Sequence, residues 1–311
     1  MGARALVPWY IRVGAKVLLS RVPVSYRAWQ CLRIFSHGEM ASAKYAYQVF
    51  QQHYPVSAFP HKGNGFVALE IGPGDGLLSA VIAAACRARR CYLVDSGRYA
   101  ATELAPYREV AEQLRASGLH PPDLTGVNNL PELLRRCNAV YLTNGLASLR
   151  ELPSHSVDFV WSHAVLEHVR RRDFPNMLRE MRRVLAPGGC CSHQVDLKDH
   201  LGGSLNNLRF ATSLWEADWF ARSGFYTNRI RFREMLALFE AAGFQVEILQ
   251  TTRFESLPLP RASLAEEFRG LSDDDLLVSG FQVLLRSAAS TEPSIDDYPE
   301  HGGTPGMGTS R

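Results

Sequence analysis

Three glycines at every second position stand out in the stretch "ALEIGPGDGLLSA", residues 68–80. Gly72, Gly74 and Gly76 follow an apolar run typical of a buried strand, and a segment with the composition of a helix comes after them. A strand that enters a helix through such a turn exposes backbone N–H groups, and a ligand can lie directly against the main chain. The turn therefore predicts a binding site in which backbone atoms make the contacts.

Asp95 lies 19 residues after Gly76, at the end of the next apolar run, "CYLVD". An acid at the end of the second strand is placed to accept hydrogen bonds from both ribose hydroxyls of a bound nucleoside. The fingerprint of nicotinamide dinucleotide sites needs its third glycine at position 77, which is Leu77 in this chain. Glu70, Asp95 and the glycine turn hence indicate a different adenosine-containing ligand.

A second group of reactive side chains, His193, Asp196, Asp199 and His200, falls within eight residues in "SHQVDLKDHLGG". This segment follows a predicted strand, and open α/β sheets bind ligands outside the carboxyl ends of their strands. Imidazole titrates near neutral pH, so we predict His200 as a general base that Asp199 or Asp196 orients, with His193 as the alternative. Two other interpretations remain: a divalent cation bound by these groups, and a capping Asp199 beside an exposed His200.

Aromatic and polar residues crowd the next segment, "NNLRFATSLWEADWFARSGFYTNRIRF", residues 206–232. Aromatic platforms beside fixed polar donors suit a polar ring, such as a sugar or a functionalised aromatic compound. Packing of the same side chains into a structural cap is the alternative. The candidate substrate-binding residues are Asp196, Trp215, Tyr226, Asn228 and Arg229.

The composition is that of a globular protein, with 311 residues of which 46% are hydrophobic and 21% charged, and a formal net charge of +3. A chain of this length buries a sizeable core, and the nearly balanced charge argues against a dedicated nucleic-acid binder. The six cysteines include no CxxC pair, and the adjacent Cys190 and Cys191 would face opposite ways on a strand. A zinc site or a disulfide framework is therefore not predicted.

Short apolar runs alternate with helical segments along most of the chain. The predicted strands are 66–71, 91–95, 139–143, 157–162, 190–197, 245–250 and 280–286. The predicted helices are 38–54, 77–88, 100–117, 174–186 and 232–243. Alternating strands and helices of this kind predict an α/β fold, in which helices cover both faces of a mostly parallel sheet.

With these motifs in this order, residues 60–290 resemble the class I S-adenosylmethionine-dependent methyltransferases. "LEIGPGDG" is similar to their first motif and "CYLVD" to their second. "SVDFVWSHAVLEHV" is similar to their fourth-strand segment, and "MLREMRRVLAPGGCC" to the helix, turn and fifth strand. The resemblance implies S-adenosylmethionine as cofactor and a Rossmann-like, seven-stranded, mostly parallel sheet of strand order 3-2-1-4-5-7-6.

The resemblance also implies roles for single residues. The backbone at Gly72 and Gly74 abuts the methionine part of the cofactor, Glu70 supports its amino group, and Asp95 holds the ribose. Asn144 stands where the family usually has an acid that touches the adenine amino group. The complete expected cofactor site, whose last two residues border the methionine part, is Glu70, Gly72, Pro73, Gly74, Gly76, Asp95, Ser96, Asn144, Gly145, Ser162 and His163.

The sulfonium of this cofactor activates the methyl group, so the protein has to align a nucleophile, exclude water and remove a proton. "HQVDLKDHLGG", "LRF", "YTNRIR" and "FSHGEMASAKYA" resemble a subgroup that modifies glycans and secondary metabolites. We therefore expect O-methylation of a sugar or a glycosylated small molecule, without a metal ion.

Three alternatives stay open. N- or C-methylation of another small molecule is the first, and a nucleic-acid methyltransferase is the second. Against the latter, "SHAV" follows the fourth predicted strand where an "NPPY"-type or cysteine motif would stand. The third is a non-catalytic cofactor-binding protein, which would lose acidic cofactor contacts such as Glu70 and Asp95.

We expect three parts in the chain. They are a helical lid at 1–58, a methyltransferase domain at 59–288 with a substrate-covering insertion at 198–231, and a disordered tail at 289–311, which is rich in Pro, Gly and Ser.

The first 38 residues carry six basic residues and no acidic one. Within 8–22, aromatic and apolar residues interleave with Arg12, Lys16 and Arg21, so a lid and a peripheral contact with an anionic membrane are both considered. No apolar stretch approaches the roughly 20 residues that span a bilayer, and no small-residue cleavage site follows the segment. We therefore expect a cytoplasmic protein.

Overall fold

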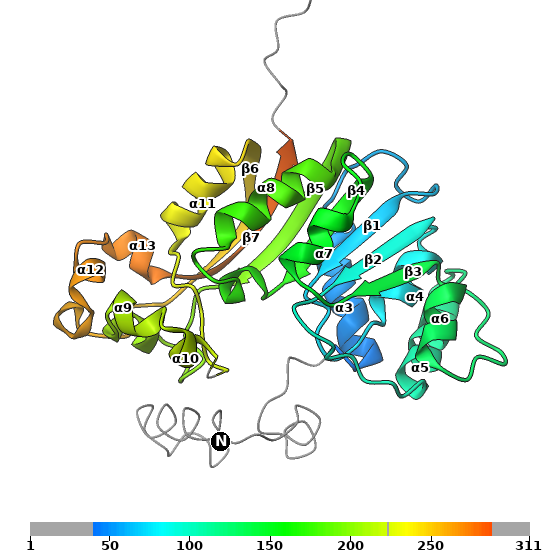
Figure 1. The fold of residues 1–311 in the computed structure, drawn as a ribbon, viewed down its shortest axis with the longest axis horizontal. Helices are drawn as coiled ribbons and strands as arrows, with labels where there is room; N and C mark the ends of the chain where they lie inside the picture. The colour runs from blue at the N-terminus through cyan, green and yellow to red at the C-terminus, as the bar shows by residue number, and fades with distance from the viewer. Residues whose placement is uncertain (1–39, 223, 288–311) are drawn as a thin grey trace, which may run out of the picture.

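In the computed structural model, residues 40–222 and 224–287 are described, and they fold around one seven-stranded sheet (Figure 1). Residues 1–39 of the expected lid, with the membrane-contact segment at 8–22, lie outside the described residues, as does the expected tail at 289–311. The strands are β1 (Val67–Ile71), β2 (Arg90–Val94), β3 (Ala139–Leu142), β4 (Val157–His163), β5 (Leu185–Asp196), β6 (Phe244–Arg253) and β7 (Val278–Ser287).

The strand order is β3-β2-β1-β4-β5-β7-β6, which confirms the Rossmann-like arrangement that the resemblance implies. Strands β1 to β5 pair in parallel, and β7 lies antiparallel between β5 and β6. The order reverses between β1 and β4. Because open α/β sheets bind their ligands at such a reversal, the carboxyl ends of β1 and β4 mark the expected crevice.

All the predicted helices are present, and they are joined by shorter ones. Helices α6 and α7 were not predicted because six or seven residues are too few to show a helical period. The helices are α3 (Ala43–His53), α4 (Ser79–Ala85), α5 (Ala105–Ala116), α6 (Leu130–Arg136), α7 (Leu146–Glu151), α8 (Phe174–Val184), α9 (Thr212–Trp215), α10 (Asp218–Ala221), α11 (Phe232–Ala241), α12 (Glu266–Arg269) and α13 (Asp273–Leu277), with 3-10 turns η2 (Leu166–His168), η3 (Asn206–Arg209) and η4 (Arg261–Ser263).

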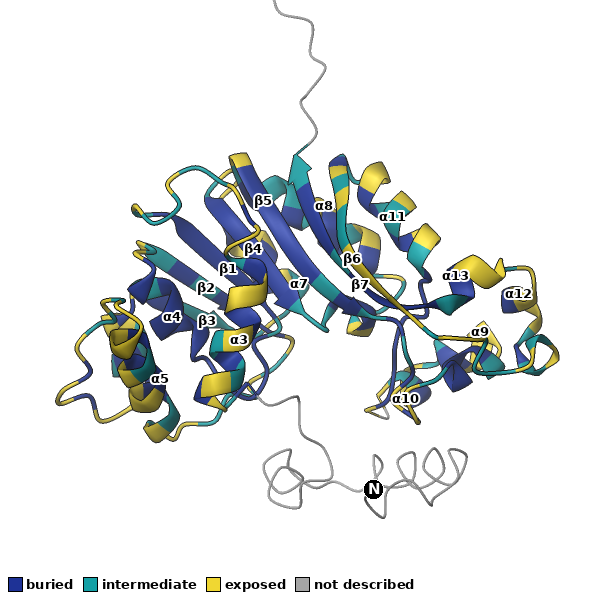
Figure 2. Cartoon of the chain, turned by 180° about the vertical axis from the view of Figure 1, so that it is seen from behind, coloured by how far each residue is buried: buried dark blue, intermediate teal, exposed yellow. Residues whose placement is uncertain are grey.

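Helices cover both faces of the sheet (Figures 1 and 2). Buried residues of α3, α4, α5 and α6 form one core with the first face, and those of α7, α8 and α11 form a second core with the other. Phe159 of β4 lies in the first core, with ring centroids 5.0 Å from Phe59 and 5.1 Å from Trp161. Phe50 of α3 meets the same ring edge-on at 6.4 Å. The described part of the expected lid is therefore integrated into the core.

Helix α8 shows how the sequence selects these elements. Pro175 lies in its first turn, where a missing N–H costs nothing, and Arg182 and Arg183 lie in the last turn, where they complement the helix dipole. Its buried residues recur every three or four positions, so one apolar stripe faces the second core. They are Phe174, Met177, Leu178, Met181 and Val184.

A small lobe, here called the cap, is formed by residues 198–231 and 254–277. Helices α9, α10, α12 and α13 lie together beyond one end of β6 and β7 (Figure 1). The Ala265 N–H donates to the Leu208 carbonyl oxygen at 2.9 Å, and the Thr212 N–H donates to the Glu267 carboxylate at 2.6 Å. The sequence predicts only the first segment as an insertion, so the second half of the cap is an addition from the structure.

The guanidinium of Arg231 ties the cap to the sheet. It donates to the carbonyl oxygens of Leu197 at 2.9 Å and Val278 at 2.6 Å, and to those of Asp275 and Leu276, both at 3.1 Å.

Across residues 40–222 and 224–287, no helix has the length and apolar character needed to cross a membrane.

Phe159 offers a test of the first core. Phe159→Ala removes a fully buried ring that stacks on two further aromatic rings, those of Phe59 and Trp161, so we expect a loss of about 3–5 kcal/mol in the free energy of unfolding. Urea denaturation of the purified protein measures it. Val56→Ala, at a 46% exposed position, is the control and should change stability by no more than about 0.5 kcal/mol. Equal effects of the two substitutions would contradict this packing.

Candidate active site

The turn after β1 is shaped by Gly72 and Gly74, whose φ angles of +72° and +67° lie in the left-handed region. Residues with a Cβ atom are strained in this region, which explains why both positions are glycine. The Gly72 N–H donates to the Val94 carbonyl oxygen at 2.8 Å, so the turn is tied to the end of β2.

Close approach of the protein itself accounts for two of the three glycines. A Cβ atom on Gly72 would lie 2.5 Å from Cγ2 of Val165, in the segment after β4. A Cβ atom on Gly76 would lie 2.4 Å from the carbonyl oxygen of Met40, just before α3. The pattern predicts space for a ligand, but at these two positions other parts of the chain fill that space.

Asp95, the first residue after β2, faces the glycine turn. Its carboxylate accepts hydrogen bonds from the N–H groups of Gly74 at 3.0 Å and Ser96 at 2.7 Å. The Asp95 carbonyl oxygen accepts the Gly145 N–H at 2.8 Å. The structure thus brings the predicted turn, Asp95 and the residues after β3 to one edge of the sheet.

The other residues predicted for the adenosine side lie at the same edge. Ser96 and Asn144, which follow β2 and β3, are exposed, and Pro73 is buried within the glycine turn. The Asn144 N–H donates to Ser148 Oγ at 3.1 Å, and Gly145 has a φ angle of +53°. These residues come from three strand ends that the sheet topology makes neighbours.

Glu70 is buried beneath the turn, only 3% exposed, and accepts a hydrogen bond from the Ser79 hydroxyl at the start of α4. Burial raises the pKa of its carboxyl group to about 7. The side chain therefore ties β1 to α4 from inside the protein. This placement favours a structural role for Glu70 over the contact with the cofactor amino group that the resemblance implies.

His163, the last residue of β4, faces helix α3. Its Nδ1 lies 3.4 Å from Nε2 of His53, and Nδ1 of His53 lies 2.8 Å from Ser192 Oγ of β5. Burial lowers the pKa of both imidazoles, so both are uncharged at neutral pH. His163 precedes Val165, whose side chain touches Gly72. An uncharged imidazole therefore lies at the carboxyl end of β4, beside the glycine turn.

Ser162 and His193 face the opposite side of the sheet. Ser162 Oγ lies 2.7 Å from His193 Nδ1, both residues are fully buried, and burial lowers the pKa of His193 to about 3. The residues two positions away from His193 along β5, Cys191 and Val195, belong to the second core. His193 is thus a core residue, which corrects its interpretation as an alternative base.

Asp199 closes the turn after β5. Its carboxylate accepts the backbone N–H groups of Leu201 at 2.8 Å, Gly202 at 2.7 Å and Asn206 at 2.5 Å. These bonds make Asp199 a capping residue, which is the structural alternative to a role in orienting His200.

His200 is exposed, and its ring stacks on that of His168 with centroids 4.8 Å apart. His168 Nδ1 lies 3.0 Å from the Tyr226 carbonyl oxygen, so the cap holds His168. Asp196 accepts the Lys198 N–H at 2.9 Å and lies 3.6 Å from its ammonium group. Both carboxylates predicted to orient His200 are therefore engaged by other groups.

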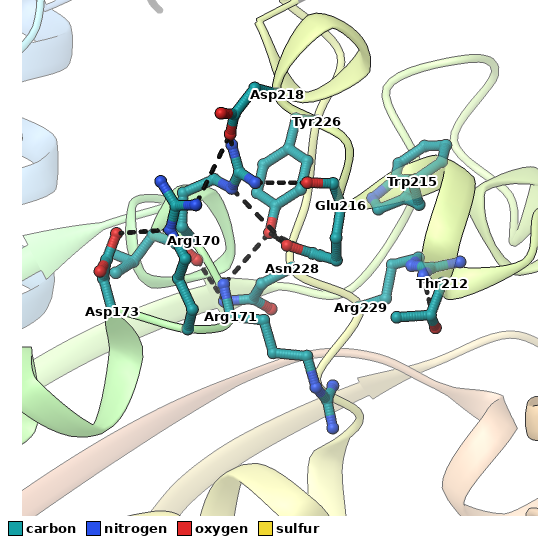
Figure 3. A network of polar contacts seen from close by, with 12 residues as sticks. Arg170, Arg171, Asp173, Thr212, Trp215, Glu216, Asp218, Tyr226, Asn228 and Arg229 are labelled. Carbon is teal, nitrogen blue, oxygen red and sulfur yellow. Dashed lines mark hydrogen bonds and ion pairs between the residues drawn. The ribbon is translucent and has the colours of Figure 1, made fainter.

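Two predicted substrate-binding residues are packed into the cap (Figure 3). Trp215 is fully buried, and its indole N–H donates to the Thr227 carbonyl oxygen at 2.6 Å. The Arg229 guanidinium lies 5.1 Å from the centre of the Trp215 ring and 4.9 Å from that of Phe268. It also donates to Thr212 Oγ1 at 2.9 Å. The structure thus gives both residues a structural role.

Tyr226 and Asn228 likewise serve the cap. The Tyr226 hydroxyl donates to the Glu216 carboxylate at 2.9 Å (Figure 3). The Asn228 side-chain amide donates to the carbonyl oxygens of Leu166, the first residue of η2, at 2.8 Å and of Val169, just after η2, at 3.1 Å. The aromatic and amide groups predicted as a sugar platform are therefore used inside the protein.

Two residues at this edge of the sheet were missed by sequence reasoning. His53 is a fully buried polar residue on the otherwise apolar buried face of α3, and that mismatch is the signal that could have indicated it. Glu167, in "VLEHV", accepts the Asp196 N–H at 3.3 Å and is 1% exposed. Burial raises the pKa of Glu167 to about 8.

Within the described part of the chain, no cluster of three or more His, Cys, Asp or Glu side chains is arranged to hold a metal ion.

Residues 69–192 match the sequence profile of a family described as a methyltransferase domain. The match contains the glycine turn, Asp95 and the segment after β4, which are the parts that the structure brings together. This chain is a class I methyltransferase. It depends on S-adenosylmethionine, as its sequence motifs, its sheet topology and this match together indicate.

No curated protein matches this methyltransferase significantly. Among solved structures, the carbon methyltransferase CurJ is 16% identical, over 83% of this chain and 57% of that one, with a TM-score of 0.43. The arsenic(III) S-adenosylmethionine methyltransferase of Chlamydomonas reinhardtii is 16% identical, over 73% and 64%, at 0.38. An S-adenosylmethionine-dependent methyltransferase from Mesorhizobium loti is 17% identical, over 72% and 93%, at 0.39. The acceptors of these proteins are not carried over to this one.

Asp95 provides a test of the cofactor site. Asp95→Ala removes a carboxylate placed for charge-assisted hydrogen bonds, so the methyltransferase should bind S-adenosylhomocysteine more weakly by roughly 1–3 kcal/mol. Isothermal titration calorimetry measures the affinity. Glu112→Ala, an exposed change on α5, is the matched control. Unchanged affinity in the Asp95 variant would remove this residue from the site.

Glu167 predicts a pH-dependent stability. Its pKa in the folded protein, about 8, lies above the value of 4.5 for a free carboxyl group. The folded state therefore keeps a proton that the unfolded state loses, and this stabilisation is complete below the lower value and is lost as the pH rises through the higher one.

Glu167→Gln keeps the neutral shape at every pH. Between about pH 5 and pH 9, the variant should lose less unfolding free energy than the wild type, as urea titrations at each pH would show. Glu247→Gln, an exposed change on β6, should follow the wild type. Parallel pH profiles for wild type and Glu167→Gln would contradict the raised pKa.

Proposed function

We propose that this methyltransferase methylates a hydroxyl oxygen of a small polar molecule, a sugar or a glycosylated metabolite. The observation that supports O-methylation is the uncharged imidazole of His163, at the carboxyl end of β4 and beside the glycine turn. An aliphatic hydroxyl has a pKa far above 7, so its methylation requires a group that takes the proton. An uncharged imidazole is such a group.

We assign the cofactor to the carboxyl ends of β1 to β4. The backbone of Gly74 would face the methionine part, Asp95 would accept hydrogen bonds from the ribose, and the exposed Asn144 would lie at the adenine. Once bound, the cofactor supplies a methyl group that its sulfonium already activates. The protein's own task is then to hold the acceptor in line with that group and to exclude water.

Two solvent-accessible side chains at and after the end of the neighbouring strand, β5, support a polar acceptor. Asp196 is half-buried at the end of β5, and His200 is exposed in the turn that follows. Both carry atoms that hydrogen-bond hydroxyl groups. The assignment to a sugar rests otherwise on the resemblance of the sequence to a glycan-modifying subgroup, because Trp215 and Arg229 are used within the cap.

The position of a transferred label tests this function. The protein is incubated with S-adenosylmethionine that carries a 13C-labelled methyl group and with fractionated host extract, and products are analysed by NMR. We expect a methyl carbon in the methoxy region, on a low-molecular-weight polar product. Asp95→Ala is the control for cofactor dependence.

Other positions of the label contradict the proposal. A methyl carbon bound to nitrogen or carbon would replace O-methylation with one of the alternative reactions. Label in the nucleic-acid fraction would identify a nucleic-acid methyltransferase.

A further inference from the structure

A hydrogen-bonded row of side chains from three elements lies behind the end of β4. Ser192 Oγ of β5 lies 2.8 Å from Nδ1 of His53, and Nε2 of His53 lies 3.4 Å from Nδ1 of His163. Ser192 and His53 are fully buried, whereas His163 is only partly buried. The row therefore begins in the core under α3 and ends at the open carboxyl edge of the sheet.

The direction of the hydrogen bonds decides what His163 can do. When Nδ1 of His163 carries the proton, it donates to Nε2 of His53, and Nδ1 of His53 donates to Ser192 Oγ. This direction leaves a lone pair on Nε2 of His163, on the side of the ring away from α3. The opposite direction would place a proton on that nitrogen and make it a donor.

The surroundings keep the row uncharged. Burial lowers the pKa of His53 well below its usual value, and the neighbouring His163 and His193 lower it further. Burial also lowers the pKa of His163, whose ring meets that of Tyr45 edge-on at 6.3 Å. An imidazole with a low pKa stays unprotonated before reaction, which is the state a proton acceptor needs.

The row ends beside the turn to which we assign the cofactor. Val165, two residues after His163, fills the space over Gly72, and the next glycine of that turn donates to Asp95. His163 is thus fixed next to the turn to which we assign the cofactor. His200, the base predicted from the sequence, is exposed instead, and both carboxylates predicted to orient it are engaged by other groups.

We propose that Nε2 of His163 accepts the proton of the acceptor hydroxyl, and that His53, held by Ser192, positions His163 and fixes its tautomer. In this step the acceptor oxygen bonds to the methyl carbon, the carbon–sulfur bond breaks with its electron pair on sulfur, and the hydroxyl proton passes to His163. The inference rests on the proposed O-methylation and names its catalytic base. His53 acts through His163 and is a positioning residue.

Helix α3 gains a function from this assignment. It lies outside residues 69–192, the part of the chain that matches the methyltransferase profile. His53 is 110 residues away from His163 in the sequence, so packing of α3 on the sheet is what brings the two rings together. The methyltransferase would complete its catalytic site with a helix from outside the matched region.

NMR tests the positioning half of the proposal without any acceptor. Imidazole 15N spectra of the full chain at neutral pH should show both His53 and His163 with the proton on Nδ1. In His53→Phe, the Nδ1-protonated fraction of His163 should fall, whereas His53→Gln, whose amide oxygen replaces Nε2 as acceptor, should retain it. A wild-type His163 with its proton on Nε2 would overturn the assignment.

Turnover tests the catalytic half, with the extract fraction that the wild-type protein labels as methyl acceptor. His163→Asn keeps an N–H donor toward His53 but lacks Nε2, so kcat should fall by roughly 10²–10⁴. His53→Phe should lower kcat by about 10–100-fold, the range seen when groups that orient metal-bound imidazoles are removed, with partial recovery in His53→Gln. His120→Asn, at an exposed position after α5, is the control, and its kcat should equal that of the wild type.

The outcomes separate this inference from the proposed function. Wild-type turnover in His163→Asn would overturn His163 as base, whichever atom is methylated. The same loss of kcat in His200→Asn, without a loss in His163→Asn, would identify His200 as the base. A label on nitrogen or carbon would overturn O-methylation itself, and the tautomer measurement would still decide the role of His53.

Discussion

The contact between Val165 and Gly72 is the constraint on which the candidate site depends. A side chain on Gly72 would collide with Val165 at 2.5 Å, so only glycine lets the segment after β4 lie against the turn after β1. From the other side, Asn228 of the cap holds the same segment through the carbonyl oxygens of Leu166 and Val169. The residues between β4 and α8 are thus clamped between the glycine turn and the cap, and His163 is positioned with them.

Around this clamp, burial disfavours the charged forms of several polar groups. Burial raises the pKa of Glu70 to about 7 and that of Glu167 to about 8, and lowers the pKa of His53 and His193. A buried charge without a partner is costly, and a neutral group with a hydrogen bond is tolerated. Burial likewise lowers the pKa of His163 at the carboxyl end of β4, so that its imidazole stays available as a base.

Local patterns were enough to predict the frame of the molecule. The strands, the glycine turn and Asp95 could be located because each is encoded within a few consecutive residues, and the strand order followed from the family resemblance. The pairing of His53 with His163 could not be predicted, because it depends on how α3 packs over the sheet. Trp215 and Arg229 were open to two interpretations for a related reason: their types suit a binding platform and a packed cap equally well, and only burial distinguishes the two.

The same contrast separates the two halves of the site. On the cofactor side, backbone atoms and strand ends make the arrangement, so a short motif around Gly74 and Asp95 suffices to encode it. On the proposed acceptor side, by contrast, α3 and the cap would take part, and the cap is attached to the sheet by long-range bonds such as those of Arg231 to Leu197 and Val278. The acceptors of these bonds are backbone carbonyl oxygens, which every residue type provides. The residue types of the acceptors therefore do not indicate that the bonds exist. On this proposal, the choice of acceptor would be encoded in the parts of this methyltransferase whose sequence patterns are weakest, so its reaction type can be identified before its substrate.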